Sequence, residues 1–367
     1  MGYVLLIIIL IYLFIYSKLV EIELNNRIVG FILSFLVVYI LAGFVTHTPD
    51  WETYEILIKY GTSRDLLFNF FTKELEDIGI NYKHIHVIYT GLYTFLMILL
   101  ISRFSKETYL IALLYIPVVY LYYTTQIRFY LGYFSMSLAA YFWYINRKKL
   151  YAVIFAIFAV ANHISLILFL PIIYLLKCDI NLLLRKVIFL SVIILIVYLI
   201  LFNTLQILFP ETFPFINYLI ESQYDSSLLG GLYTFLPAII GFILIHVYSK
   251  RKFLQIPEII NDKKFQFLYK MSIIPIIFLA ISLERQIIGR RFIIPALLFQ
   301  LILVFYTYKK YNTLKQKINL TAFTGSFLTF YYIYKYLITP HIIDVSTINE
   351  NIALMLRTNS ILYYIFQ

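Results

Sequence analysis

Three arginines and a histidine that could take part in binding or catalysis lie at the ends of long apolar segments of this sequence. Arg128 opens one segment, Arg290 and Arg291 precede another, and His163 follows a third. A charged side chain at mid-membrane costs about 2.5–3.5 kcal/mol on insertion scales, so each of these arginines needs compensation. A guanidinium group donates two parallel hydrogen bonds to a phosphate. The pattern therefore favours binding of an anionic substrate, with a diphosphate as the best match.

Two residues are candidates for general acid–base chemistry. His163 can accept a proton near neutral pH, although a lone histidine is often a buried, hydrogen-bonded imidazole. Asp50 is the second candidate base, although Pro49-Asp50 is also a good helix start. Trp51 and Tyr54 follow Asp50. They would either stack on sugar rings or anchor the chain at the headgroup level.

The arginines also have a structural alternative, as interface anchors or ligands of lipid headgroups. Arg285 has Glu284 beside it as a possible partner, whereas Arg128 has no acid nearby in the sequence. Gln126, two residues before Arg128, completes the candidate binding set. Gly289 permits a helix break or a close backbone approach ahead of Arg290.

Several classes of site are missing from the sequence. It contains no Walker loop, no GxGxxG, no HExxH and no DxD pair. The single cysteine, Cys178, rules out an internal disulfide and a cysteine-based metal site. His84 and His86 have poor metal-binding spacing. We therefore expect no cofactor and no metal, and a lipid-linked donor on the outer side rather than a cytoplasmic nucleotide sugar.

The composition indicates a membrane protein. Of 367 residues 62% are hydrophobic and 13% are charged, whereas a soluble domain has about 25% charged residues. The net charge of +11 lies in short loops, which is typical of membrane topology and anionic lipid rather than of nucleic-acid binding. We expect an all-α, polytopic transmembrane bundle that forms a single integral membrane domain, 1–367.

Apolar windows predict about 12 spans. They lie at about 3–17, 28–45, 86–101, 109–124, 128–145, 150–162, 164–176, 187–208, 231–249, 266–284, 291–308 and 319–339. The first is expected to be a retained span with the N-terminus outside. Residues 46–85 are predicted to form an extracytoplasmic loop with an amphipathic helix on the outer leaflet, and 340–367 an amphipathic or re-entrant tail.

The positive-inside rule places the candidate residues on the outer side of the membrane. Most of the lysines and arginines fall in alternate loops, which are then cytoplasmic, but only if 150–176 is a hairpin rather than one tilted span. A helix over 150–162 is about 20 Å long, against a hydrocarbon core of about 30 Å. The apex at Asn162-His163 should therefore lie below the outer surface, inside the protein.

An ordered set of motifs resembles the EpsG/Wzy-type polymerases of bacterial surface polysaccharides. The set consists of Asp50 with Tyr54, Ile127-Arg128, Ala159 and Ala161 before His163 and Ser165, and Arg291-Phe292. The sequence departs from the family pattern at Phe129, where glutamine is frequent, and at Asn162, where an aromatic residue is common. These departures concern subfamily and substrate.

The resemblance implies a metal-independent glycosyltransferase with a GT-C-like fold in the bacterial plasma membrane. Such proteins move a growing exopolysaccharide, capsule or O-antigen chain from undecaprenyl diphosphate to the next lipid-linked repeat unit at the outer face. The implied partners are the undecaprenyl-diphosphate-linked oligosaccharide, the lipid bilayer and, in some systems, a chain-length regulator. Arg128, Arg290 and Arg291, with Arg285, would hold the diphosphate, and His163 or Asp50 would orient or deprotonate the acceptor hydroxyl.

Two other functions fit the same sequence. A GT-C-type glycosyltransferase or ligase would add one sugar or glycan, which the length of the product distinguishes from polymerisation. A non-enzymatic flippase would be expected to show repeat symmetry and charge through the middle of the bundle, and neither is evident. Its loss would leave lipid-linked units on the inner side of the membrane, whereas loss of a polymerase would leave them on the outer side.

Overall fold

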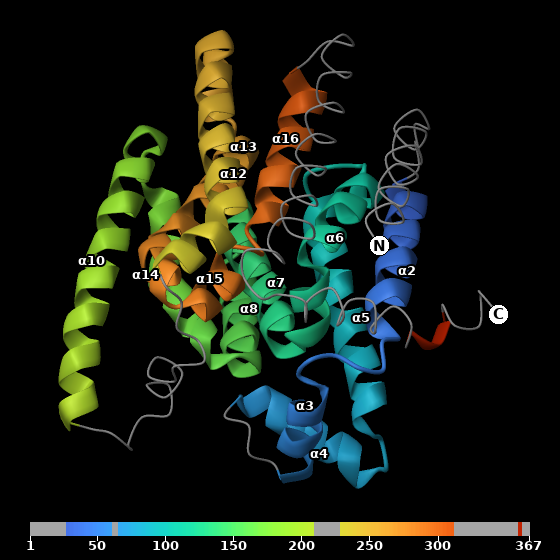
Figure 1. Ribbon diagram of the computed structural model, residues 1–367. Helices are drawn as coiled ribbons and strands as arrows, with labels where there is room; N and C mark the ends of the chain where they lie inside the picture. Colours follow the sequence, from blue (N-terminus) through green and yellow to red (C-terminus); the bar gives the residue numbers. More distant parts are fainter. Residues whose placement is uncertain (1–26, 61–64, 209–227, 312–358, 362–367) are drawn as a thin grey trace, which may run out of the picture. The chain divides into compact units, whose positions relative to one another are not determined.

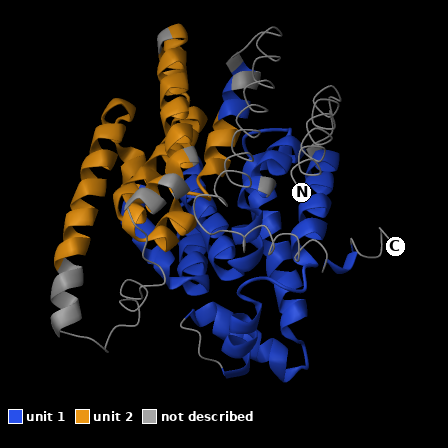
Figure 2. Ribbon diagram, viewed as in Figure 1, with its two compact units in different colours: residues 1–173, 304–367 blue, residues 174–303 orange. Residues whose placement is uncertain are grey.

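All regular secondary structure in the described residues is helical. The computed structural model describes residues 27–60, 65–208, 228–311 and 359–361. The chain divides into two compact units, unit 1 with residues 1–173 and 304–367 and unit 2 with residues 174–303 (Figure 2). The predicted spans 3–17 and 319–339, and all of the predicted tail except 359–361, lie outside the described residues.

The chain is a membrane protein by the length and composition of its helices. Four helical stretches of the described residues are long and apolar enough to cross a bilayer: Tyr82–Ser102, Ile180–Ile200, Lys263–Glu284 and Gln286–Thr307. The bent pair Thr108–Ile116 and Val118–Thr125 makes a fifth if it is one span. Each predicted span within the described ranges is helical for most of its length, although several are short or interrupted.

An almost fully buried helix forms the centre of unit 1. Helix α7 (Ile127–Tyr141) has an apolar sequence on all sides, and nearly all its residues are buried. It packs against α5 (Tyr82–Ser102), α6 (Thr108–Thr125) and α8 (Lys149–Asn162), and α2 (Arg27–Gly43) packs against α5 and α6 (Figure 1). The side chain of His86 lies 3.2 Å from the carbonyl oxygen of Gly43 and 3.0 Å from that of Thr124, linking α5 to the ends of α2 and α6.

Helix α8 returns along α7 after a tight turn. A π-helical turn, η1 (Phe142–Asn146), extends α7, and Arg147 takes the left-handed conformation with φ 55°. Gly132 of α7 lies directly against α8, since a Cβ atom at that position would stand 2.8 Å from the backbone oxygen of Ala159. Helices α7 and α8 therefore pack closely along the segments that lead to Arg128 and His163.

The helix breaks at His163, where the sequence predicts the apex of a hairpin. Helix α8 ends at Asn162, and His163 is extended with φ −153° and ψ 107°. Three short helical segments follow: η2 (Ile164–Leu168), α9 (Phe169–Ile173) and η3 (Tyr174–Lys177). The membrane crossing of the two halves stays a prediction.

The loop between α2 and α5 folds into two short helices rather than one. Helices α3 (Trp51–Tyr60) and α4 (Leu66–Asp77) pack against each other, and α3 also packs on the N-terminal end of α5 (Figure 1). Helix α4 is amphipathic, with Phe68 fully buried while Leu66 and Phe70 are exposed. Helix α4 lies within 46–85, and the position of this loop outside the membrane and its contact with the outer leaflet stay predictions.

Unit 2 contains two long helices and a chain of short ones. Helix α10 (Ile180–Leu208) packs on α13 (Lys263–Ile273), η6 (Ile274–Phe278) and α14 (Leu279–Glu284), and α12 (Leu228–Gln255) packs on η5 (Pro257–Asn261), α13, α14 and α15 (Gln286–Phe292). Helix α16 (Leu297–Tyr311) begins in this unit. The buried Lys270 donates a hydrogen bond of 2.8 Å to the carbonyl oxygen of Leu176, which offsets part of the cost of burying its charge.

Candidate functional site

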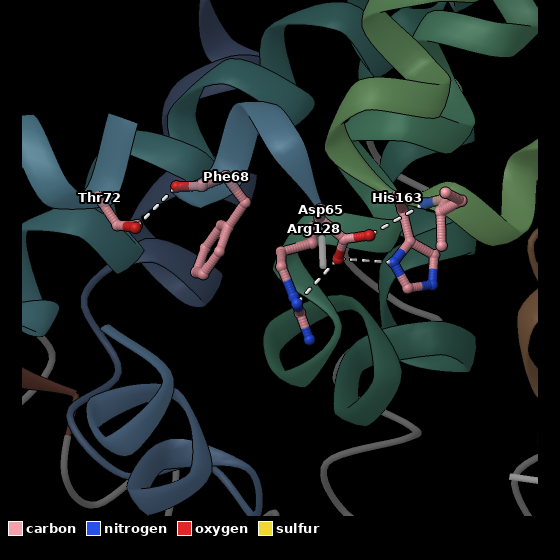
Figure 3. Close-up of polar contacts among 6 residues, drawn as sticks. Asp65, Phe68, Thr72, Arg128 and His163 are labelled. Carbon is pink, nitrogen blue, oxygen red and sulfur yellow. Dashed lines mark hydrogen bonds and ion pairs between the residues drawn. The ribbon is translucent and has the colours of Figure 1, made fainter. Parts of the chain in front are cut away.

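A buried carboxylate joins two of the predicted site residues in unit 1. Asp65 precedes α4 and is 4% exposed. Its Oδ2 atom accepts a hydrogen bond of 2.8 Å from Nη1 of Arg128 and lies 3.2 Å from Nδ1 of His163 (Figure 3). Its Oδ1 atom accepts the backbone N–H of Ile164 at 3.0 Å. Asp65, Arg128 and His163 thus form one cluster of polar side chains, which we call the Asp65 cluster.

The folding of α7 and α8 explains why Arg128 and His163 meet. Arg128 is the second residue of α7, and His163 directly follows α8. Because α8 runs back along α7 after the turn at Arg147, the start of one helix and the end of the other lie at the same end of the pair. The amino-terminal end of α4 then brings Asp65 to the same place.

Aromatic rings surround the Arg128 guanidinium. Its Cζ atom lies 5.1 Å from the centre of the Tyr54 ring and 5.0 Å from that of Phe68, distances at which a cation is attracted to a ring face. Tyr54 also stacks on Tyr82 at 5.4 Å, and Phe68 meets Tyr89 edge-on at 5.4 Å. These rings hold the guanidinium in a fixed orientation beside the carboxylate.

The electrostatics of the Asp65 cluster favour an ionised carboxylate. Burial alone raises the pKa of Asp65, but the hydrogen bond with His163, the charge of Arg128 and the N–H of Ile164 oppose that rise, and the pKa lies below its usual value. Burial also raises the pKa of Tyr54, and the charge of Arg128 offsets part of that rise. An ionised carboxylate next to a guanidinium and an imidazole is an arrangement that can orient a base.

The other predicted residues of unit 1 lie near the Asp65 cluster in different roles. Asp50 is exposed and directly precedes α3. Trp51 donates its indole N–H to Glu55 at 2.8 Å and packs edge-on against Tyr82 at 4.5 Å. Gln126 links α6 to α7, and its Oε1 atom is buried without a hydrogen-bond partner among the described residues.

The predicted arginines of unit 2 stand at a break between two short helices. Arg285 separates α14 from α15, is 4% exposed, and donates from Nε to the hydroxyl of Tyr198 at 2.6 Å. Arg290 donates to the side-chain oxygen of Gln286 at 2.8 Å, and Arg291 is half-buried. These arginines belong to unit 2, whereas Arg128 and His163 belong to unit 1, and a meeting of the two groups stays a prediction.

Sequence reasoning missed Asp65, and the reason is physical. An aspartate directly before an amphipathic helix is the usual sign of an N-cap. Here the backbone of Asp65 takes the extended N-cap conformation, but its side chain makes no capping hydrogen bond. The only available signal was the absence of an acid near Arg128 in the sequence, which implied a partner from elsewhere in the chain.

Comparison with known proteins identifies the family. No curated protein and no solved structure matches the chain. The family model of EpsG matches residues 28–349, a range that contains the Asp65 cluster and the arginines of unit 2. The match confirms the resemblance found in the ordered motifs around Asp50, Arg128, His163 and Arg291. The chain therefore belongs to the EpsG family.

Proposed function

We propose that this protein polymerises a surface polysaccharide at the outer face of the bacterial plasma membrane. It transfers a growing glycan from undecaprenyl diphosphate to the next lipid-linked repeat unit. Membership of the EpsG family supports this class of activity. The observation that carries the proposal is the Asp65 cluster, in which a guanidinium and an imidazole share one buried carboxylate.

The proposed reaction is a substitution at the anomeric carbon of the growing chain. The acceptor hydroxyl forms a new bond to that carbon, and the bond from the carbon to the diphosphate oxygen breaks. The electron pair of the broken bond stays on undecaprenyl diphosphate, which leaves. The hydroxyl proton passes to the base, for which His163 is favoured over the exposed Asp50 because His163 lies beside Arg128 in the cluster.

The proposed role of the arginines is to bind the diphosphate as its negative charge grows. Preorganised cations stabilise developing charge more in a site that excludes water than they do in water. Arg128, Arg285, Arg290 and Arg291 are the proposed ligands, and Gln126, Trp51 and Tyr54 are proposed to contact the sugar or the diphosphate. No metal and no cofactor take part in the proposed reaction.

The proposal includes a fold and a set of partners. We propose about 12 spans in a GT-C-like arrangement, with 46–85 outside the membrane. The proposed partners are the undecaprenyl-diphosphate-linked oligosaccharide, the surrounding lipid and, where chain length is controlled, a chain-length regulator.

The test is polymer length in a strain whose own copy is replaced by variants. Arg128→Ala and His163→Gln should abolish long-chain polymer while the protein still reaches the membrane, and single lipid-linked units should accumulate at the outer face. Arg147→Ala, at the opposite end of α7, is the matched control and should give normal chains. Normal chain lengths in Arg128→Ala would reject the proposal. Accumulation at the inner face would favour a flippase, and a wild-type product extended by one unit would favour a ligase.

A further inference from the structure

Asp65 stands out among the acids of this chain. It is the one Asp or Glu that is buried among the described residues, and its two oxygens receive three contacts from two separate segments, the start of α7 and the break after α8. A carboxylate that only neutralised Arg128 would not need the extra contacts to His163 and to the N–H of Ile164. Those contacts fix the carboxylate relative to the histidine ring.

The charges of the Asp65 cluster favour a neutral imidazole. The negative charge of the Asp65 carboxylate already cancels the positive charge of the Arg128 guanidinium. The net charge of the three side chains is therefore zero when His163 is neutral. A protonated His163 would leave a net positive charge where Asp65 is 4% and His163 is 9% exposed. Because burial of an uncompensated charge is costly, the neutral form is favoured.

The contact to Asp65 decides which nitrogen of the neutral ring carries the proton. An ionised carboxylate can only accept hydrogen bonds. The nitrogen that faces it, Nδ1, is 3.2 Å from Oδ2 and must therefore be the donor. The proton on Nδ1 leaves Nε2 with its lone pair, which is the form of histidine that can take a proton from a hydroxyl.

The ring is held from a second side as well. The Phe129 ring meets the His163 ring edge-on, with centres 5.6 Å apart and planes at 88°. The backbone N–H of His163 donates to the carbonyl oxygen of Ala159 at 3.0 Å, which fixes the point from which the side chain extends. The imidazole thus has a set position, a set orientation and one preferred proton location.

We propose that Asp65 is a positioning residue that holds His163 in the Nδ1–H tautomer and so presents Nε2 as the base. The role in catalysis rests on the proposed function, whereas the tautomer itself does not. In the transfer step Nε2 receives the proton of the acceptor hydroxyl. The imidazolium that forms is stabilised by the carboxylate already hydrogen-bonded to Nδ1, while Asp65 stays ionised.

The direct test is the nitrogen-15 spectrum of purified full-length protein labelled at histidine, near neutral pH. His163→Gln identifies the His163 signals by their loss. We expect a protonated Nδ1 and an unprotonated Nε2 in the wild-type protein. Asp65→Ala should move the proton to Nε2, and Asp77→Ala, at the exposed far end of the same helix, should leave the signals unchanged. A wild-type protein with its proton on Nε2 overturns the proposal even if Asp65→Ala fails to fold. An unmoved proton in folded Asp65→Ala also overturns it.

A second measurement separates this inference from the proposed function. Transfer of labelled repeat units in membranes should fall by about 10²–10⁴-fold in Asp65→Ala, which is the usual contribution of a positioned base. Asp65→Glu, which keeps the carboxylate, should recover part of that loss. A moved proton with a normal transfer rate would support the positioning of His163 by Asp65 and refute His163 as the base of the proposed reaction.

Discussion

Gly132 offers a way to displace the Asp65 cluster without touching it. An added Cβ atom would stand 2.8 Å from the backbone oxygen of Ala159 and would also overlap the Leu166 side chain. The Leu166 side chain can rotate away, but the Ala159 oxygen is backbone and accepts the N–H of His163 at 3.0 Å. Relief of the overlap must therefore move the last turn of α8 and His163 with it.

The size of the effect follows from the distance. To reach the 3.4 Å at which ordinary contacts begin, the Ala159 oxygen must retreat by about 0.6 Å. A misplacement of about 1 Å costs roughly 10²-fold in rate, so Gly132→Ala should lower polymerisation by about 10-fold. Overpacking costs about 1–3 kcal/mol, and the gain in helix propensity returns about 0.5–1 kcal/mol. Taken at their middle values, these terms leave a net loss of about 1 kcal/mol, which should lower Tm by about 2–4 °C.

The assay is thermal unfolding in detergent together with transfer of labelled repeat units in membranes. The matched control is Gly30→Ala in α2, where an added Cβ atom has its nearest neighbour at 3.5 Å. That variant should keep the wild-type rate and an equal or higher Tm, because it gains helix propensity without overlap. If Gly132→Ala matched Gly30→Ala in both measurements, close packing of α7 on α8 would not be what positions His163.

Three further predictions concern the charged side chains. Arg128→Lys keeps the charge beside Asp65 but loses the planar group that lies over two rings, so initial-rate assays should show a loss of about 10-fold, and a wild-type rate would contradict the stacking. Tyr198→Phe leaves a guanidinium N–H of Arg285 without its present acceptor, at a cost of about 1–3 kcal/mol that a lower Tm in detergent should reveal; an unchanged Tm would refute that cost. Folding lowers the pKa of Asp65, so the ionised Asp65 carboxylate stabilises the fold at any pH above the pKa of an unfolded aspartate, about 3.9. That stability is lost as the pH falls through the lower pKa of Asp65 in the folded protein. Tm measured from pH 7 to pH 3 should therefore fall only at the acid end, and Asp65→Asn should make that fall smaller; an equal fall in both proteins would count against it.

The sequence predicted the helices well because their signal is local. Apolar windows and basic loops located the segments that became α5, α10 and α12, and the shortness of 150–162 predicted a break that the structure places at His163. The same reasoning placed Arg128 and His163 on one side, and the return of α8 along α7 brings them to one end.

The Asp65 cluster could not be predicted because its signal is not local. Asp65 lies 63 residues from Arg128 and 98 from His163, and the packing of α3 on α5 and of α4 on α8 brings it to them. Seven acids lie in the loop over 46–85, and nothing in composition separates Asp65 from the other six. Tyr54 is 5% exposed and its ring lies against Arg128 and Tyr82, a contact that the sequence does not indicate.

Because the net charge of the Asp65 cluster is zero, Arg128 alone is poorly placed to balance the charge of a bound diphosphate. Nη1 of Arg128 already donates to Asp65, so a diphosphate would have to use the remaining N–H groups of the guanidinium. The negative charge of the diphosphate would then add to a cluster whose net charge is zero, and burial of that negative charge would be costly. Under the proposed function, further cations must therefore accompany the diphosphate. Arg285, Arg290 and Arg291 are the cations that the proposed function assigns to this role.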